Sequence, residues 1–221
     1  MKVVVGLGGE MQDTALLRDR VAGADLIIGA DSGAARLVAC GIRPNLVTGD
    51  FDSLDPALLA ELQMAGTDSV PHPDPENITD AEAALRLAAE RGADEVVLLG
   101  THGAERLDHS FGSMLLTVNA AYSSLRITII DGWTEAVGLR GDGRRSVRFE
   151  GETGDYVSLV ALTERVTGVR TEGLRWPLRD GELRLGTTQG VSNELAGREG
   201  GFEIKGGAAL ATHHFRQQRL A

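Results

Sequence analysis

Acidic residues recur in the first half of the sequence, just after apolar runs or at the starts of expected helices. They lie in the segments GADSG, TGDFDS, NITD and RLDH and are Asp31, Asp50, Asp52, Asp80 and Asp108. In an open α/β sheet, ligands bind beyond the carboxyl ends of the strands, so carboxylates at successive strand ends can face one pocket. Carboxylates and phosphate oxygens are the ligands that Mg²⁺ prefers. The pattern therefore predicts an enzyme with an acidic pocket that binds metal and phosphate.

The pair Asp50 and Asp52 is the most specific part of this pattern. In an extended segment, residues i and i+2 point to the same side, so both carboxylates could bind one ion. An Asp-x-Asp sequence alone is often only a solvated turn, but the position after Gly49 and an apolar run favours a metal site. For Asp31 and Asp80, helix capping or compensation of a helix dipole is an equally good interpretation when each is taken singly.

Two glycine-containing turns and one arginine are candidate phosphate ligands. The turns are residues 6–9 and 29–33, the second of which includes Ser32 and Gly33. Their N–H groups could hold phosphate, although glycine is also needed in tight turns and neither segment is a Walker A loop. Arg106 and His109 flank Asp108, and Arg106 could donate two hydrogen bonds to one phosphate. A surface arginine is the alternative for Arg106.

The elements that must position these residues alternate between strand and helix over residues 1–135. Such alternation indicates βαβ units, hence an α/β fold with a mostly parallel sheet and right-handed crossovers. Asp55 with Pro56, and Thr79 with Glu82, are typical helix starts. We expect strands at residues 2–7, 26–28, 46–48, 95–100 and 125–130 and helices at about 32–40, 55–65, 79–91 and 107–122.

The pattern changes after about residue 135. Short alternating segments separated by glycine-containing turns predict a small antiparallel β-sandwich or barrel over residues 136–221. The expected strands are at residues 146–149, 156–160, 174–178, 182–185 and 202–205. The adjacent pair His213 and His214 would face opposite ways on a strand, so we interpret it as structural or surface rather than as a metal site.

Composition narrows the function further. The net charge of −10 and the scattered Lys and Arg residues argue against nucleic acid or an anionic membrane as a partner. The single cysteine, Cys40, excludes an intramolecular disulfide and lies in an apolar run, so it is expected to be a small buried hydrophobe. No segment is typical of a signal peptide or approaches the ~20 apolar residues of a membrane span. A cytoplasmic protein is expected.

Six segments in sequence order together resemble one family. They are GADSGAARL, PNLVTGDFDSLD, NITDAEAAL, RLDHSFGSM, EGLRWPL and GTTQGVSNEL, and they resemble thiamine pyrophosphokinase over about residues 29–195. The resemblance implies transfer of a pyrophosphoryl group from Mg²⁺–ATP to the hydroxyethyl oxygen of thiamine, which gives thiamine diphosphate and AMP. It also implies a homodimer with thiamine sites between two subunits.

The resemblance assigns roles to particular residues. The acids Asp50, Asp52, Asp80 and Asp108 would hold Mg²⁺ or orient the thiamine hydroxyl. Trp176 would stack on the thiamine rings, where a thiazolium cation gains cation–π attraction; a core aromatic is the alternative. Ser192 and Asn193 would contact the pyrimidine. The ATP and phosphate ligands would be Asp31, Ser32, Gly33, Arg106 and His109.

The chain departs from the family pattern in three places. Glu76 and Asn77 stand where relatives carry Lys or Gln followed by Asp, the 103–106 segment is one residue longer, and Ser113 replaces a common Asn. These departures keep two other functions open: a pyrophosphokinase for another heterocyclic alcohol such as a pterin, and a catalytically silent nucleotide or thiamine sensor. The retained acids argue against the sensor.

Overall fold

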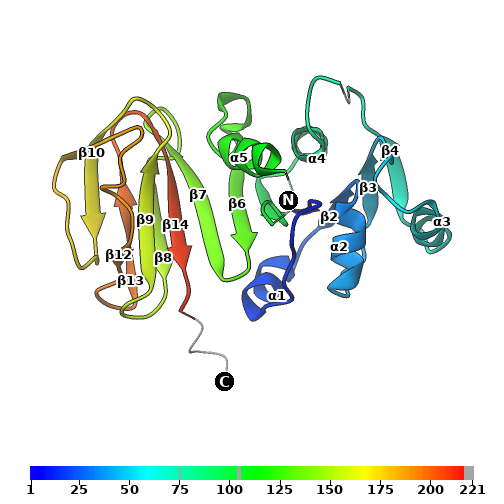
Figure 1. Ribbon diagram of the computed structural model, residues 1–221, viewed down its shortest axis with the longest axis horizontal. Coiled ribbons are helices and arrows are strands. Elements are labelled where there is room, and N and C mark those ends of the chain that lie inside the picture. The colour runs from blue at the N-terminus through cyan, green and yellow to red at the C-terminus, as the bar shows by residue number, and fades with distance from the viewer. Residues whose placement is uncertain (75, 104–105, 217–221) are drawn as a thin grey trace. The chain divides into compact units, whose positions relative to one another are not determined.

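The computed structural model describes residues 1–74, 76–103 and 106–216, and its chain divides into two compact units (Figure 1). The first unit contains residues Met1–Leu116 and Ser124–Gly132, and the second contains Thr117–Ser123 and the chain from Trp133 onward. Among the described residues, no helix is both long enough and apolar enough to cross a membrane.

The first unit contains a parallel sheet with the strand order β6-β5-β1-β2-β3-β4. Val4 pairs with Ile27 on one side and with Val97 on the other, both in parallel register. The predicted α/β class with a mostly parallel sheet is confirmed. The strands are β1 (Lys2–Gly6), β2 (Leu26–Ala30), β3 (Leu46–Gly49), β4 (Asp68–Pro71), β5 (Glu95–Leu99) and β6 (Arg126–Asp131).

Helices cover both faces of this sheet, with α1 and α2 on one side and α4 and α5 on the other (Figure 1). Leu17 of α1 and Leu37 of α2 pack with Val4 and Val97 in one apolar core. The expected caps are present: Thr79 Oγ1 accepts from Glu82 N, and Asp55 Oδ1 accepts from Ala57 N. The helices are α1 (Ala15–Val21), α2 (Gly33–Ala39), α3 (Pro56–Met64), α4 (Asp80–Glu90) and α5 (Leu107–Leu116).

The helix expected over residues 107–122 is shorter than predicted. The α5 helix ends at Leu116, and Ala120–Tyr122 forms a separate 3₁₀ turn, η1, whose first residue follows the capping side chain of Asn119. Residues 117–123 belong to the second unit, where Arg140 Nη1 donates to the carbonyl of Val118 at 2.7 Å. This tertiary contact uses a carbonyl that a continuing helix would need, so it overrides the local helical pattern.

The strand order places a topological switch point between β1 and β5. The chain builds β1, β2, β3 and β4 outward in one direction and then crosses back through α4 to place β5 on the other side of β1. Loops leaving the carboxyl ends of β1 and β5 therefore diverge, and ligands of doubly wound sheets bind in the resulting crevice.

The second unit contains two antiparallel arrays, β12-β9-β14-β7 and β11-β10-β13-β8. Their inward side chains, including Leu139, Phe149, Leu159 and Val166, form one buried core. The expected antiparallel β-domain is confirmed, although several of its strands were not anticipated. The strands are β7 (Thr134–Arg140), β8 (Ser146–Glu150), β9 (Tyr156–Ala161), β10 (Arg165–Glu172), β11 (Gly181–Arg184), β12 (Asn193–Glu194), β13 (Glu199–Glu203) and β14 (Ala208–His214).

One expected strand of this domain, at residues 174–178, is wrong. The segment makes a single bridge, between Leu174 and Leu195. Pro177 has no N–H to offer a ladder. The N–H of Trp176 donates to the side chain of Asn193 instead of to a strand.

His213 forms a buried pair with Asp155, in agreement with its interpretation as structural. Both side chains are 1% exposed, and His213 Nε2 lies 3.1 Å from Asp155 Oδ2. Burial lowers the pKa of His213 below its usual range, and the positive charge of His214 adds to this; the hydrogen bond to Asp155 and the charges of Asp155 and Glu135 oppose it. The neighbouring His214 is exposed and lies 3.0 Å from Thr134 Oγ1.

This burial predicts a pH dependence of stability. Because the folded pKa of His213 is below the unfolded value of about 6.5, its contribution to stability is present above that pH and is lost as the pH falls through the folded pKa. One such proton gives a slope of at most about 1.4 kcal/mol per pH unit. Urea unfolding from pH 8 to pH 5 should show a smaller loss of stability in His213→Gln than in the wild type. The exposed neighbour provides the control: His214→Gln removes only the smallest of the influences on the pKa of His213 and should keep nearly the wild-type slope. Equal slopes for His213→Gln and the wild type would contradict the assignment.

Candidate active site

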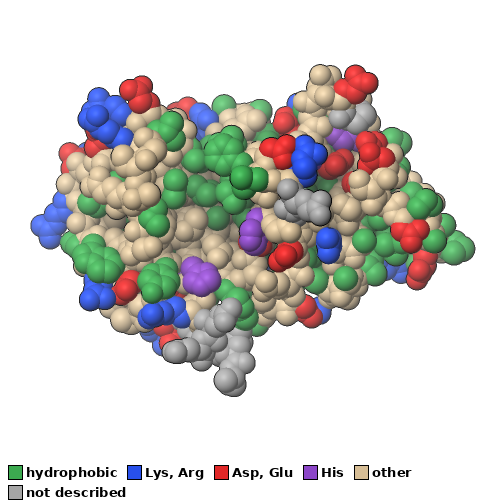
Figure 2. Space-filling view, in the orientation of Figure 1, with side chains coloured by type: hydrophobic (Ala, Val, Ile, Leu, Met, Phe, Trp, Pro, Cys, Tyr) green, Lys and Arg blue, Asp and Glu red, His purple; other side chains and the backbone are tan. Residues whose placement is uncertain are grey.

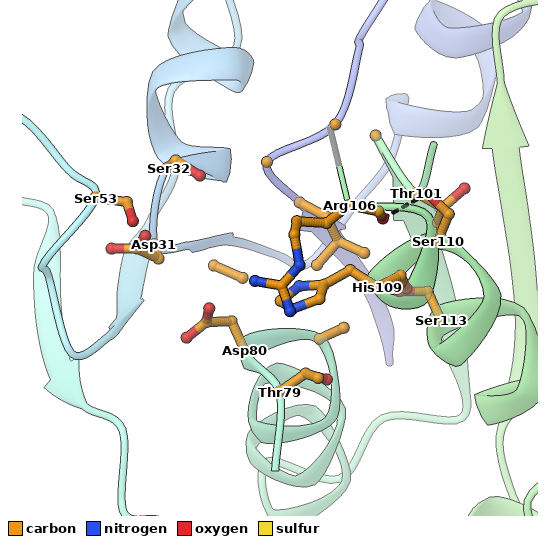
Figure 3. Close-up of a pocket in the computed structure, with 16 residues that line it drawn as sticks. Asp31, Ser32, Ser53, Thr79, Asp80, Thr101, Arg106, His109, Ser110 and Ser113 are labelled. Carbon is orange, nitrogen blue, oxygen red and sulfur yellow. Dashed lines mark hydrogen bonds between the residues drawn. The ribbon is translucent and has the colours of Figure 1, made fainter. Parts of the chain in front are cut away.

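A pocket of ≈ 260 Å³ lies at the carboxyl ends of β1, β2 and β5, at the switch point of the first sheet (Figure 3). Helices α4 and α5 contribute Asp80, His109 and Ser110 to its wall. Figure 3 shows the guanidinium of Arg106 and the carboxylate of Asp80 pointing into the same space. The full lining is Leu7, Gly8, Gly9, Ala30, Asp31, Ser32, Ser53, Thr79, Asp80, Ala81, Gly100, Thr101, Arg106, His109, Ser110 and Ser113.

Three of the predicted acids converge next to this pocket. Asp31, Asp50 and Asp52 each offer a carboxylate oxygen, and these oxygens all lie within 4.8 Å of one another. Asp31 is 5% exposed, whereas Asp50 and Asp52 are exposed. The structure therefore adds Asp31, expected beside the nucleotide, to the pair that the sequence indicates as metal ligands.

The backbone brings Asp50 and Asp52 together by a turn and not by the extended segment expected from their spacing. Phe51 has a left-handed conformation (φ 63°), and the N–H of Asp52 donates to Asp50 Oδ1 at 3.1 Å. An Asp side chain that bonds a backbone N–H two residues on forms such a turn readily. The left-handed conformation costs a residue such as Phe roughly 1–2 kcal/mol, and strain of this kind is concentrated at functional sites.

Asp31 is held close to the strand that precedes the turn. Its own backbone is left-handed (φ 47°), and its N–H donates to the carbonyl of Thr48 at 2.7 Å. A Cβ on Gly49 would lie 2.9 Å from the Cβ of Asp31. Only glycine fits at position 49, and this explains the Gly-Asp sequence at the end of β3.

The charges of the group suit a cation. Burial raises the pKa of Asp31 above its usual range, and the charges of Asp52 and Asp50 raise it further, against hydrogen bonds from Ser32 and Ser53. Asp31 Oδ1 is buried and has no hydrogen-bond partner among the residues that the structure describes. A buried carboxylate oxygen without a partner, facing two further carboxylates, fits a hard divalent cation such as Mg²⁺.

Asp80 belongs to the same electrostatic group. Burial raises its pKa, and the charges of Asp31, Asp50 and Asp52 add to that effect, while His72 lowers it. Asp80 is the first residue of α4, where the helix N-terminus favours negative charge. Its place in the pocket wall leaves it within reach of a ligand bound there.

Like Asp80, Asp108 lies outside the cluster of three carboxylates, and it is paired with Arg106 instead. Its two oxygens accept from Arg106, from Nε at 3.0 Å and from Nη2 at 2.7 Å. These hydrogen bonds lower the pKa of Asp108 to about 2. Both side chains are exposed, and Arg106 also lines the pocket. The two hydrogen bonds from Arg106 to Asp108 therefore orient the guanidinium.

Two of the remaining candidate phosphate ligands line the pocket, and the third packs behind its wall. Ser32 and His109 line it. Gly33, the first residue of α2, is buried, and a Cβ there would lie 2.0 Å from the carbonyl oxygen of Gly6, so it lets α2 approach β1.

Several hydroxyl groups of the pocket were missed by the sequence analysis. Ser53, Thr101 and Ser110 line it. Thr101 follows β5 and Gly100 directly, so the rule that ligands bind beyond strand ends would have found it. Its hydroxyl donates to Asp131 Oδ2 at 3.0 Å, and His102 Nδ1 lies 2.6 Å from the same oxygen.

The three candidate thiamine ligands lie in the second unit. Trp176 is 51% exposed, and the guanidinium of Arg175 lies 4.8 Å from the centre of its ring. The side chain of Asn193 bonds the backbone of Trp176. Ser192 has a left-handed backbone (φ 64°), and its N–H donates to Ser158 Oγ at 3.0 Å.

Comparison with known families agrees with this arrangement. The model of the thiamin pyrophosphokinase catalytic domain matches residues 17–129, and that of the thiamin pyrophosphokinase vitamin B1 binding domain matches residues 146–208. The chain belongs to the thiamin pyrophosphokinase family. The resemblance noted in the sequence is thereby confirmed.

Individual members of the thiamin pyrophosphokinase family are similar over most of the chain. Thiamine pyrophosphokinase of Bacillus subtilis is 28% identical over 185 residues, which are 84% of this chain and 85% of the relative. The crystal structure of thiamin pyrophosphokinase from Geobacillus thermodenitrificans is 29% identical, with a TM-score of 0.81 and coverage of 100% of both chains. The yeast enzyme, 14% identical, shares the fold with a TM-score of 0.78 over 99% of this chain and 87% of its own.

The acidic group predicts that Mg²⁺ stabilises the protein through Asp31. A ligand that binds only the folded state adds about 2.7 kcal/mol when present at 100 times its Kd. Thermal unfolding should therefore shift upward with Mg²⁺ in the wild type and much less in Asp31→Asn. Without Mg²⁺ the variant should equal or exceed the wild type in stability, because repulsion among the three carboxylates is relieved.

The control is Asp68→Asn, an exposed acid at the start of β4. This variant should keep the wild-type response to Mg²⁺. An unchanged Mg²⁺ response in Asp31→Asn would remove Asp31 from the metal site.

Proposed function

We propose that the protein is a thiamine diphosphokinase that transfers a diphosphoryl group from Mg²⁺–ATP to the hydroxyethyl oxygen of thiamine. The products are thiamine diphosphate and AMP. The observation that carries the proposal is the group Asp31, Asp50 and Asp52 beside a pocket at the switch point of an α/β sheet. The match of residues 146–208 to a vitamin B1 binding domain supports thiamine as the acceptor. In this proposal residues 1–135 bind ATP and residues 136–221 bind thiamine.

The acids in and beside the pocket have the first part in the proposed reaction. Asp50 and Asp52, with Asp31 and Asp80, would hold Mg²⁺. When bound, Mg²⁺ neutralises charge on the phosphate oxygens of ATP. The thiamine hydroxyl oxygen loses its proton and forms a bond to the β-phosphorus. The bond from that phosphorus to the α–β bridging oxygen breaks, and AMP leaves with that oxygen. The group transferred is highly charged, so positioning and electrostatics dominate the catalysis.

Arg106 would bind the phosphate chain, with Ser32, Gly33 and His109 as further ATP ligands. Asp108 holds Arg106 through two hydrogen bonds and thereby fixes the direction of its guanidinium. Each Asp108 oxygen keeps a second lone pair, so this contact is compatible with the metal role that the resemblance gives Asp108. On the acceptor side, Trp176 would stack on the thiamine rings, and Ser192 and Asn193 would provide polar contacts. The side chain of Asn193 bonds the backbone of Trp176. The positive thiazolium ring favours an aromatic face.

We also propose that the protein acts as a cytoplasmic homodimer with its active sites near the interface between copies. An uncovered apolar stripe on α5 supports the dimer, because Leu107, Phe111 and Leu115 recur at every fourth residue and are 82%, 56% and 39% exposed. Figure 2 shows hydrophobic side chains gathered over this helix. Contiguous exposed apolar side chains are typical of interaction surfaces. The cytoplasmic location follows from the proposed use of ATP.

The function is tested by AMP formation from Mg²⁺–ATP, with and without thiamine, while thiamine diphosphate is followed in parallel. We expect thiamine-dependent AMP in amounts equal to thiamine diphosphate. Asp52→Asn should lower kcat at least 100-fold and leave the unfolding temperature near that of the wild type, because it removes charge from an exposed carboxylate and not core packing. Asp68→Asn is again the matched control and should keep wild-type activity.

Two results would contradict this proposal. Near-wild-type turnover by Asp52→Asn would remove Asp52 from the metal site. A folded, ATP-binding protein that forms no thiamine-dependent AMP would exclude thiamine as the acceptor. Such a result would direct attention to Glu76 and Asn77 and to a different heterocyclic alcohol, or, if ATP binds without turnover of any acceptor, to a sensor.

The dimer is tested by sedimentation of a variant of the α5 stripe. Phe111→Glu should shift the mass from dimer to monomer, because a charge replaces an apolar contact at the proposed interface. Met64→Glu introduces the same charge at an exposed apolar residue of α3, outside the α5 stripe, and should leave the dimer intact. Met64 is 84% exposed. A wild-type protein that sediments as a monomer would overturn the proposal.

A further inference from the structure

The segment that carries Trp176 is not held by a regular strand. Its neighbour Leu174 makes one bridge to Leu195, and the N–H of Arg175 donates to the carbonyl of Glu194 at 2.9 Å. The ladder ends there, because Pro177 lacks an N–H. The backbone of Trp176 is therefore anchored by something other than sheet pairing.

That anchor is the side-chain amide of Asn193. Its Oδ1 accepts from the N–H of Trp176 at 3.1 Å, and its Nδ2 donates to the carbonyl of Trp176 at 2.7 Å. The two backbone groups fix which way the amide points, since the N–H can face only the oxygen and the carbonyl only the nitrogen. The Asn193 amide thus makes the two hydrogen bonds to the Trp176 backbone that a neighbouring strand would otherwise make.

The amide of Asn193 has little capacity left for a ligand. Besides the N–H of Trp176, Oδ1 accepts from the N–H of Glu194 at 2.9 Å, so both of its lone pairs are used. One of the two Nδ2 hydrogens is also used. Asn193 itself is fixed by β12, where it pairs with Val157 of β9.

The indole of Trp176 is contacted by the side chain of its neighbour Arg175. The guanidinium of Arg175 lies 4.8 Å from its ring centre, and Arg175 Nη1 donates to Glu194 Oε2 at 2.8 Å. Trp176 is 51% exposed, so much of its ring surface is accessible to a flat molecule in the part of the protein that the structure describes. An aromatic platform that is ordered before binding loses less freedom when the ligand arrives.

We propose that Asn193 is a positioning residue that acts on the acceptor through Trp176: its amide clamps the Trp176 backbone so that the indole is in place before thiamine binds. This inference rests on the proposed function and gives Asn193 a role other than the direct pyrimidine contact that the family resemblance implies. Ser192, which precedes Asn193 in the sequence, remains the candidate for direct contact with the pyrimidine.

A double-mutant cycle on the KM for thiamine separates the two roles. Asn193→Ala should raise this KM about tenfold, the effect of losing two ordinary hydrogen bonds, and should leave the KM for ATP unchanged. In a Trp176→Ala background, the same substitution should have almost no further effect, because no indole remains to be positioned. Additive effects would show direct contact of Asn193 with thiamine and would overturn the proposal.

A second readout needs no substrate. The chain has two tryptophans, so Trp133→Phe leaves Trp176 as the sole tryptophan, which can be excited selectively over the two tyrosines. In that background, Asn193→Ala should lower the fluorescence anisotropy of Trp176 as the indole becomes mobile. Unchanged anisotropy would overturn the proposal. Because thiamine is absent, failure of the proposed function cannot alter this result and appears separately in the wild-type activity assay.

The matched control loosens the same segment at its other end. Thr171 Oγ1 accepts from the N–H of Leu178 at 2.8 Å, two residues beyond Trp176. Thr171→Val should leave both the thiamine KM and the anisotropy near wild type. Equal effects of Thr171→Val and Asn193→Ala would show general loosening and would also overturn the clamp. Should Asn193→Ala not fold, Asn193→Asp keeps the volume and the Oδ1 acceptor and removes the donor.

Discussion

The mutual repulsion of three carboxylates is the constraint on which the catalytic unit depends. Asp31, Asp50 and Asp52 have oxygens within 4.8 Å of one another, and Asp31 is buried with one oxygen lacking any partner in the described part of the chain. Such an arrangement is unfavourable without a cation. Burial raises the pKa values of Asp31 and Asp80, and the neighbouring carboxylates raise them further. The fold must therefore supply enough rigidity to hold like charges together. A stable apolar core with a strained edge meets this requirement.

The strain is located in the two turns that carry the acids. Asp31 and Phe51 both have left-handed backbones, and Gly49 lies between them in space where any side chain would meet Asp31. Parallel strands buried on both faces fix the ends of these turns, since β2 and β3 pair in register up to Ala30 and Thr48. The regular sheet thus holds conformations that the turns would not adopt alone. The candidate metal ligands therefore follow directly on the strands whose pairing holds them in place.

The elements of the α/β unit could be predicted from the sequence because local signals agree there with tertiary structure. The caps of Asp55 and Thr79 and the apolar runs of β1 and β5 are examples. The end of α5 could not be predicted, since it is set by Arg140, a residue distant in sequence. The grouping of strand-end acids was foreseeable from topology. The left-handed turn at Phe51 and the pairing of Asp108 with Arg106 were not, because neither leaves a pattern in spacing or hydropathy.

Two motif residues of this protein bond neighbouring motif residues. Asp108 uses both of its oxygens on Arg106, and Asn193 uses most of its amide on the backbone of Trp176. In the first pair the side chain that can reach a ligand is the long guanidinium of Arg106. In the second pair it is the flat indole of Trp176. A long or bulky side chain loses much rotamer freedom when it binds, and a short polar neighbour can remove that cost in advance. A family motif of this kind therefore includes both the residue that can contact a ligand and the neighbouring residue that holds it in position.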